Sequence, residues 1–466
     1  KEWLNLSATG RWDKNSTLPA QNNVGFYPSV SLSAVLTEAL KLPDFISFLK
    51  VRTSYAQVNK GFTYSQIGPT PNAAYPLGYG STYYSPYDGP DYSNSPVYST
   101  PLVYNNQPGA YYPNTLTNDN LDTYKTSATE VGLDVRFLAN RIGLDVTYFN
   151  NIDGPRISTQ PLSTTTGYSG YLTNGEKTQR KGLEIVVSAK PIDKGDFKWN
   201  MMFNWSTYKE TWKEFAPGQT RSGFYEIGDR VDGYYAGAFY KTQDGQLIND
   251  AGGRPINTAV AQFLGNLNPD WSWGFTNRFN YKNWGLSFQF DGRVGGVIVN
   301  YIQRQTFRGG RHIETTQGAM GEARAQDALG IKSWVGEGVV ISNGVSIEYD
   351  AVTGAITNYD ELQFAPNTTP TFLQDYISRY YAAEEFNVMS RTYAKLREVT
   401  LSYNIPASFL ERSVIRNASI SLVGRNLLYF SDKKDMDIDQ FVAPNAYATL
   451  QSPSMRRYGF NINITF

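Results

Sequence analysis

Very few side chains of this sequence are of a kind that could carry out catalysis. The 466 residues include no cysteine and one histidine, His312. There is therefore no thiolate nucleophile and no multi-histidine metal site, and a Ser-His-Asp triad is possible only through His312. His312 follows the glycine- and arginine-rich stretch 308–311, so we interpret it as a solvated loop residue rather than a general base. We predict no catalytic residue, no cofactor and no enzymatic activity.

A run of closely spaced carboxylates near the C-terminal end is the one candidate for metal binding. Its members are Asp432, Asp435, Asp437 and Asp439. Alternate aspartates can offer oxygen ligands to Ca²⁺, but the run lacks the glycine and the terminal glutamate of an EF-hand loop. We interpret it as a solvated loop or a partner contact and predict no metal site, with calcium as the alternative.

Tyrosine is concentrated between residues 75 and 112. Its side chain joins an apolar ring to a hydrogen-bonding tip, so exposed tyrosines could stack on sugar rings or pack against a protein lid. Packing of the loops on one another is an equally good interpretation. The candidate substrate- or lid-contacting residues are Tyr75, Tyr79, Tyr83, Tyr84, Tyr87 and Tyr92.

The elements that position these residues are strands with one apolar and one polar face. In the last nine residues, Tyr458, Phe460, Ile462, Ile464 and Phe466 alternate with small or polar residues, and side chains two apart share a face of a strand. Residues 271–282 and 284–293 alternate in the same way across a tight turn, which predicts a hairpin. The same rule predicts about twelve strands in all.

The two faces of these strands predict different surroundings. We expect one face to meet lipid, and its candidates are Trp271, Trp284, Phe288, Phe460 and Phe466. We expect the other to line a wet lumen, and its candidate polar residues are Arg136, Arg278, Asp291, Arg293 and Glu398. The lumenal charges could bind cargo, or they could pair with one another, because an isolated charge there is costly.

The connections between strands alternate between long and short. Long ones are expected near residues 13–24, 59–124, 151–178, 209–270, 295–391 and 431–455, and short ones near 37–45, 138–141, 191–196, 282–283 and 406–416. Nothing in a β-sandwich forces this alternation, whereas an outer-membrane barrel has turns at one rim and functional loops at the other. We therefore predict an all-β, transmembrane, antiparallel up-and-down β-barrel with long extracellular loops and short periplasmic turns.

Composition agrees with this fold class. Lys plus Arg and Asp plus Glu both number 42, so there is no basic footprint for nucleic acid. Aromatic residues make up 15% of the chain, which is typical of β-rich proteins. No apolar run approaches the ~20 residues of a membrane helix. The chain begins at Lys1 without a leader-like segment, so we expect the native N-terminus to lie upstream or to have been removed.

Several motifs resemble those of the SusC-like TonB-dependent outer-membrane transporters. They include the segments at 13–19 and 25–31, Glu130-Val131-Gly132-Leu133-Asp134, Lys181-Gly182-Leu183-Glu184, the segment at 264–270, the segment at 395–403 and Gly424-Arg425-Asn426-Leu427. Their order and spacing cover essentially the whole chain. The resemblance implies a barrel of about 22 strands around an N-terminal plug, of which residues 1–466 are the C-terminal part of a single barrel domain.

The resemblance also implies a function and partners. We expect a gram-negative outer-membrane protein that imports bulky nutrients, oligosaccharide or peptide. The partners would be a SusD-like surface lipoprotein as a lid, the TonB complex through the absent plug, the remaining N-terminal half of the barrel, and outer-membrane lipid. The alternatives are a soluble or surface β-rich glycan-binding or adhesive protein, and a structural barrel component of a larger outer-membrane machine.

Overall fold

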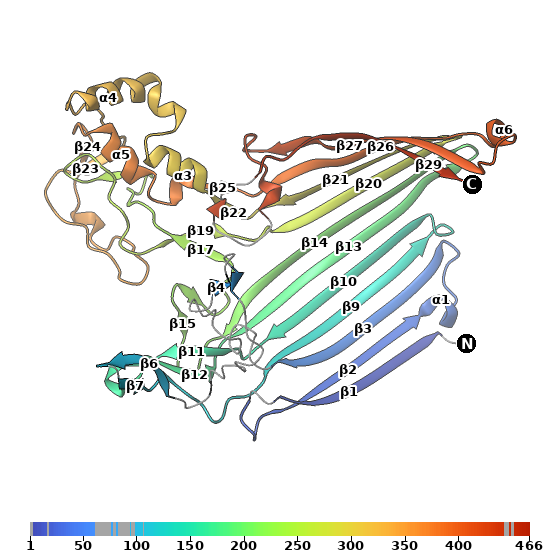
Figure 1. Ribbon diagram of the computed structural model, residues 1–466, viewed down its shortest axis with the longest axis horizontal. Coiled ribbons are helices and arrows are strands. Elements are labelled where there is room, and N and C mark those ends of the chain that lie inside the picture. Colours follow the sequence, from blue (N-terminus) through green and yellow to red (C-terminus); the bar gives the residue numbers. More distant parts are fainter. Residues whose placement is uncertain are drawn as a thin grey trace. The chain divides into compact units, whose positions relative to one another are not determined.

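The long strands of the chain form one antiparallel sheet. The computed structural model describes residues 3–15, 18–60, 76–77, 81–82, 94, 98–105, 107–441, 447–448 and 452–466. Twelve strands lie in the order β1 (Leu4–Lys14), β2 (Val24–Val35), β3 (Ile46–Lys60), β9 (Tyr124–Phe137), β10 (Ile142–Asp153), β13 (Lys177–Lys194), β14 (Phe197–Glu214), β20 (Trp271–Tyr281), β21 (Trp284–Val294), β26 (Tyr393–Asn404), β27 (Asn417–Ser431) and β29 (Arg457–Thr465). Each long strand is followed along the chain by its neighbour in the sheet (Figure 1). This is up-and-down topology, and the predicted fold class is confirmed.

The chain divides into two compact units, and two of the boundaries between them fall within β13 and β14. Unit 1 comprises Lys1–Ala189 and Ser206–Val231, and unit 2 comprises Lys190–Trp205 and Asp232–Phe466.

Tight turns join the strands at the short-connection end, where the sequence predicts them. Lys282, at a φ of 50°, lies in the turn between β20 and β21, and Trp271 to Tyr281 pair with Val294 to Trp284 without a shift in register. Leu138, Ala139 and Asn140 also have positive φ in the turn between β9 and β10. Short helices occupy two other connections, α1 Leu36–Ala39 and α6 Ala407–Leu410.

The long connections carry the remaining elements. In unit 1 these are β4 Pro76–Leu77, β5 Ser81–Thr82, β6 Ser99–Tyr104, β7 Gln107–Tyr111, β8 Thr115–Leu116, β11 Ile157–Pro161, η1 Thr164–Thr166, β12 Gly170–Asn174, β15 Arg221–Ser222 and β16 Tyr225–Glu226. In unit 2 they are β17 Gly233–Ala236, β18 Ile248–Asn249, β19 Gln262–Asn266, β22 Val297–Asn300, α3 Tyr301–Arg308, η2 Ile313–Thr316, α4 Gly318–Ala328, β23 Val339–Ile341, η3 Tyr359–Glu361, β24 Phe364–Pro366, α5 Leu373–Tyr380, η4 Glu385–Asn387, β25 Val388–Ser390, η5 Ile438–Gln440 and β28 Tyr447–Ala448. Within the described residues, every helix is too short or too polar to cross a membrane.

The buried apolar clusters lie mainly in the long connections rather than on the large sheet. One cluster, in unit 1, joins Leu18, Leu121, Ile157 and Leu172. Others, in unit 2, centre on Ile298, on Leu373 and on Ile248. Large apolar side chains of the sheet stay exposed, for example Leu422 at 59% and Phe460 at 74%. A sheet of a soluble sandwich would bury that face.

A polar side chain lies on the apolar face of β20. Asn277 of β20 pairs with Phe288 of β21, at a position where alternation predicts an apolar residue. Its side chain is buried, and Trp199 Nε1 donates a hydrogen bond to its Oδ1 at 2.9 Å. The hydrogen bond offsets part of the cost of placing an amide on this face.

Candidate functional site

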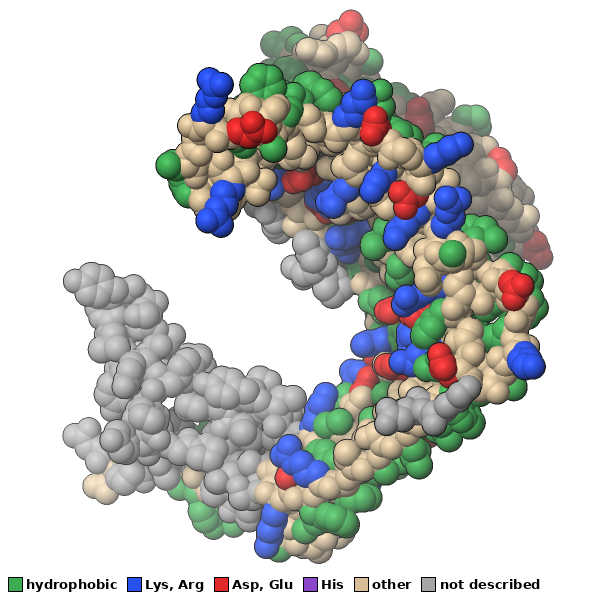
Figure 2. Space-filling view, turned by 90° about the vertical axis from the view of Figure 1, so that its right-hand side faces the viewer, with side chains coloured by type: hydrophobic (Ala, Val, Ile, Leu, Met, Phe, Trp, Pro, Cys, Tyr) green, Lys and Arg blue, Asp and Glu red, His purple; other side chains and the backbone are tan. Residues whose placement is uncertain are grey.

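Ionisable side chains of unit 2 meet on the polar face of β21 and β26, the face opposite the exposed apolar residues. We call this group the charged wall. It consists of Asp291 and Arg293 from β21, Tyr393, Lys395 and Arg397 from β26, and Asp437 and Asp439 from the loop that follows β27. Figure 2 shows acidic and basic side chains intermixed rather than gathered in patches of one sign.

A β-bulge turns Arg397 toward this wall. Phe290 pairs with Leu396, but the preceding residue of β21, Gln289, pairs with Glu398, so Arg397 is an extra residue in its strand. Strict alternation would direct Arg397 and Glu398 to opposite faces. The bulge instead leaves both on the polar side, and bulges are known to re-aim side chains in this way.

The guanidinium of Arg397 joins two carboxylates. Its Nη2 donates to Asp291 Oδ2 at 2.7 Å and to Asp439 Oδ1 at 2.7 Å. Its Nε and Nη1 donate to the remaining oxygen of each carboxylate. Paired bonds of this kind fix geometry as well as charge. Asp439 belongs to η5, so Arg397 ties a long loop to the sheet.

Two further side chains of β26 hold the same loop. Lys395, with a side chain only 4% exposed, places Nζ 2.7 Å from Asp437 Oδ2 and 3.5 Å from Asp439 Oδ2. The Tyr393 hydroxyl donates to Asp439 Oδ1 at 2.7 Å. Burial alone would raise the pKa of Asp439, but the hydrogen bonds from Arg397 and Tyr393 and the nearby positive charges outweigh it and lower the pKa to about 2.

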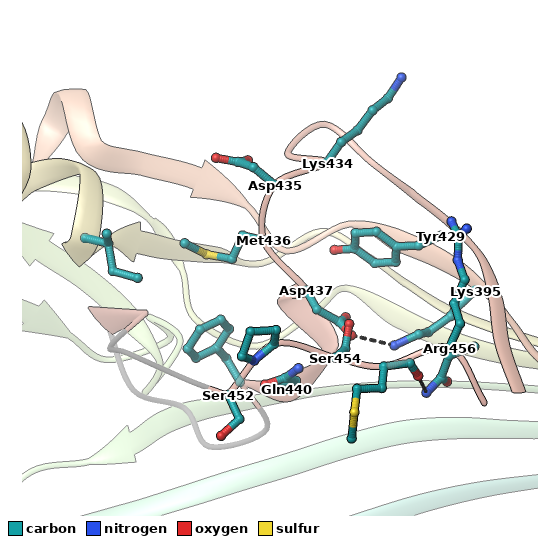
Figure 3. A pocket seen from close by; sticks show the side chains of 15 residues that line it. Lys395, Tyr429, Lys434, Asp435, Met436, Asp437, Gln440, Ser452, Ser454 and Arg456 are labelled. Carbon is teal, nitrogen blue, oxygen red and sulfur yellow. Dashed lines mark hydrogen bonds and ion pairs between the residues drawn. The ribbon is translucent and has the colours of Figure 1, made fainter. Parts of the chain in front are cut away.

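A pocket of about 390 Å³ opens beside the charged wall. Figure 3 shows Lys395, Tyr429 and Asp437 around it, with the ion pair between Lys395 and Asp437 drawn as a dashed line. The Ile438 backbone N–H donates to the Tyr429 hydroxyl at 2.9 Å. The Asn426 amide donates to the Met455 carbonyl oxygen at 3.2 Å. These bonds hold the walls of the pocket.

Unit 1 has a polar face of a different kind. Arg52 of β3 donates to both oxygens of Asp145 of β10, at 2.9 and 2.8 Å, and to Thr147 Oγ1 at 2.7 Å. It crosses β9 over Gly132, where a Cβ would lie 2.5 Å from Arg52 Nε. Small hydroxyl residues line the same face, and a hollow of about 160 Å³ is formed by Ser31, Ser33, Lys50, Arg52, Ser54 and Glu130 among others.

The structure brings together some of the predicted lumenal residues. Asp291 and Arg293 belong to the charged wall, where Arg293 Nη2 lies 3.9 Å from Asp439 Oδ1. Glu398 instead accepts from Arg425 Nε at 2.8 Å. Arg136 lies in unit 1, with Nη2 3.4 Å from Asp134 Oδ2, and Arg278 is exposed on β20.

The predicted lipid-facing residues share the apolar face of their strands. Trp284, half exposed, packs against Tyr403 with ring centroids 4.7 Å apart, and Trp271 lies 6.5 Å from Trp205. Phe288, Phe460 and Phe466 lie on β21, on β29 and one residue past β29. Their contact with lipid stays a prediction.

The remaining sequence-predicted candidates are six tyrosines and His312. The six tyrosines Tyr75, Tyr79, Tyr83, Tyr84, Tyr87 and Tyr92 lie outside the described residues. His312 stacks on Phe307 with ring centroids 3.8 Å apart, and its Nδ1 accepts from the Glu314 backbone N–H at 3.4 Å. His312 is thus half-buried at the N-terminal end of η2, and its lack of a catalytic role stays a prediction.

The four aspartates of the acidic run have different surroundings. Asp437 and Asp439 face Lys395 and Arg397, whereas Asp432 and Asp435 are exposed. No group of three or more His, Cys, Asp or Glu side chains is placed to hold a metal ion among the residues described. The absence of a metal site stays a prediction.

Sequence reasoning missed three residues of this site, Tyr393, Lys395 and Arg397, two of which are cationic. One signal was available. Arg397 and Glu398 are two consecutive charged residues between Leu396 and Val399, and such a break in the alternation is what a bulge produces.

The up-and-down sheet with an exposed apolar face defines an outer-membrane β-barrel. Residues 2–225 match the family model described as "TonB dependent receptor-like, beta-barrel". The chain is 25% identical to TonB-dependent receptor P3 of Formosa agariphila over 92% of this chain and 40% of that receptor. It is 27% identical to TonB-dependent receptor SusC of Bacteroides thetaiotaomicron over 63% of this chain and 29% of that receptor.

Solved structures share the fold. The RagAB peptide importer in its open-open state superposes with a TM-score of 0.68 at 16% identity, over 100% of this chain and 45% of that one. The predicted resemblance to TonB-dependent outer-membrane receptors is thereby confirmed, as is the predicted location in the gram-negative outer membrane. It spans less than half the length of the curated relatives that it matches.

Proposed function

We propose that this chain forms part of the wall of a TonB-energised importer of bulky nutrients across the outer membrane. Its cargo would be an oligosaccharide or a peptide. The proposal is supported by the similarity to SusC and other TonB-dependent receptors and by the fold shared with a peptide importer. The matched family is one of receptors rather than enzymes.

One observation carries the proposal. The sheet exposes its apolar face while its opposite face carries ionisable and hydroxyl side chains that are paired or line hollows. A protein surrounded by water on both sides would bury such an apolar face against a second layer. A soluble glycan-binding or adhesive protein would need such a second layer, and the exposed apolar side chains of the described residues have none.

The proposed mechanism needs partners. A SusD-like surface lipoprotein would close over the long loops, and the TonB complex would act through a plug held inside the complete barrel. This chain would supply lumenal surface and lid-contacting loops, with the six tyrosines between residues 75 and 92 as candidate contacts. Its first and last strands in the sheet order, β1 and β29, would pair with the rest of the barrel.

Uptake by whole cells tests the proposal. Cells that produce the complete receptor are given fluorescent peptides or oligosaccharides of graded length, with and without a functional TonB complex. We expect uptake of one ligand class that stops when TonB is removed, and co-purification of a surface lipoprotein in detergent. Uptake without TonB, or a stable monomer without detergent, would contradict the proposal.

A further inference from the structure

The pocket beside the charged wall has the size and composition of a ligand site. Its volume of about 390 Å³ lies within the range of sites for small molecules. Its lining comes from β26, β27, the loop after β27, the segment before β29 and Ile302 of α3, all within unit 2. Two neighbouring strands, a helix and two loop segments therefore form the pocket.

The floor of the pocket presents an unpartnered hydrogen-bond acceptor. The Asp437 side chain is only 9% exposed, and its Oδ2 is bound by Lys395 Nζ. Its other oxygen, Oδ1, is buried without any hydrogen-bond partner. A buried carboxylate oxygen left in this state is costly, so a ligand that donates a hydrogen bond there gains affinity.

The mouth of the pocket is formed by exposed cations, in contrast to the hydrogen-bond acceptor on its floor. Lys434 and Arg456 line it, both are exposed, and within the described residues neither has a carboxylate partner within 4.0 Å. Asp435 is the one acidic residue at the mouth, so the mouth carries a net positive charge. An anionic group is therefore favoured there.

Apolar side chains complete the lining. Met436, Phe441 and Pro453 also line the pocket. A ligand that satisfies all three parts has an N–H donor, a modest apolar side chain and a carboxylate. A neutral sugar could donate a hydroxyl to Asp437, but it would leave both cations of the mouth without a counter-charge.

We propose that this pocket binds a short peptide with a free carboxylate end. The carboxylate lies between Lys434 and Arg456, a backbone or terminal N–H donates to Asp437 Oδ1, and a side chain packs on Met436 and Phe441. The assignment of this peptide as cargo rests on the proposed import function, whereas the binding itself does not.

Binding to the complete receptor in detergent tests the pocket directly. The probes are the tripeptide Ala-Leu-Ala, the same peptide with an amidated C-terminus, and maltotriose as a neutral sugar, each measured by calorimetry. Ion pairs at an exposed mouth are each worth roughly a two- to fivefold change in affinity. We expect amidation to weaken binding about fivefold or more, and maltotriose neither to bind nor to compete.

Two matched double variants distinguish binding in the pocket from general attraction of the peptide by positive surface charge. Lys434→Ala with Arg456→Ala removes the cations of the mouth, and we expect this variant to bind the free and the amidated peptide equally. Lys433→Ala with Arg457→Ala removes the adjacent cations, which do not line the pocket, and we expect it to keep the preference for the free carboxylate. Both changes are at the surface and leave the sheet intact.

A third variant tests the floor. Asp437→Asn removes a charged acceptor, and we expect the affinity for the free tripeptide to fall about tenfold. Equal binding of the free and amidated peptides to the unsubstituted receptor would overturn the proposal, as would competition by maltotriose. TonB-dependent uptake in cells is measured separately, so absence of peptide binding with uptake intact would refute the pocket and leave the import function standing.

Discussion

The two units each place an Arg–Asp pair on the polar face of the sheet, but in different surroundings. In unit 1, Arg52 and Asp145 have side chains 39% and 37% exposed, and the pair links strands within the sheet. In unit 2, Arg397 and Asp291 are 28% and 25% exposed, and the same guanidinium holds Asp439, which is 15% exposed. The two pairs therefore have similar hydrogen bonds, but the first joins strands of the sheet and the second also holds a loop.

The difference lies in what each pair connects. The pair of unit 1 faces a hollow lined by small hydroxyl side chains, so water can screen it and its energetic contribution is small. The wall of unit 2 fastens a loop to the sheet through Arg397, Lys395 and Tyr393. Loss of one partner there leaves charges that water reaches poorly, which is costly.

Arg397→Ala gives the largest expected effect. Both Asp291 and Asp439 would lose their bidentate partner, so we expect unfolding of the complete receptor in detergent to require about 4 kcal/mol less free energy. Urea titration followed by tryptophan fluorescence measures this loss. Arg397→Lys keeps the charge without the fork, and its loss should be intermediate. If Arg397→Ala lowered the free energy of unfolding by less than Arg52→Ala does, the proposed difference between the two units would be wrong.

Lys395→Met is expected to cost about 3 kcal/mol, because Asp437 would stay buried without its cation. Combining it with Asp437→Leu removes both charges. Apolar replacement of a complete buried pair is often neutral, so the double variant should recover most of the lost stability in the same titration. An additive loss in the double variant would show that the pair is not the source of the effect.

Acid should weaken the charged wall through Asp439. Its folded-state pKa of about 2 lies below the ordinary value of 3.8, so its contribution to stability is complete above pH 3.8 and is lost as the pH falls through 2. The contribution at pH 6 is about 2 kcal/mol. Stability curves of the unsubstituted receptor and of Asp439→Asn should therefore differ by this amount at pH 6 and converge near pH 2. Parallel curves would contradict the assignment.

Arg52→Ala should have the smallest effect, a loss of less than about 1 kcal/mol. Added salt should shrink the difference further, because the pair is exposed and screened. Gly132→Ala should displace Arg52 from Asp145, so its effect should not add to that of Arg52→Ala in the double variant. A salt-independent loss would show that the pair of unit 1 is as buried as the wall of unit 2.

Much of the fold could be predicted because its signal is local. The alternation in residues 271–294 and 457–466 and the regular change from short to long connections are properties of neighbouring residues. They follow from a sheet that lies between an apolar and a polar environment. The polar side of Asp291 and Arg293 and the apolar side of Trp284 and Phe288 were predictable for the same reason.

The candidate site was predictable only in part. The aspartates of 432–439 were recognisable as a group, but their partners were not. Arg397 reaches Asp439 across 42 positions of sequence, and a bulge decides which face of β26 its side chain joins. A pattern with a period of two residues carries no information on either point.

The sequence by itself determined the strands, their two faces and the alternation of turns and loops, because each depends on residues within a few positions. Only the tertiary structure decided that the loop after β27 returns to β26, where Lys395 and Arg397 bind Asp437 and Asp439. That choice depends on the closure of a long loop and on the cost of burying charges without partners, and both are properties of the folded chain as a whole.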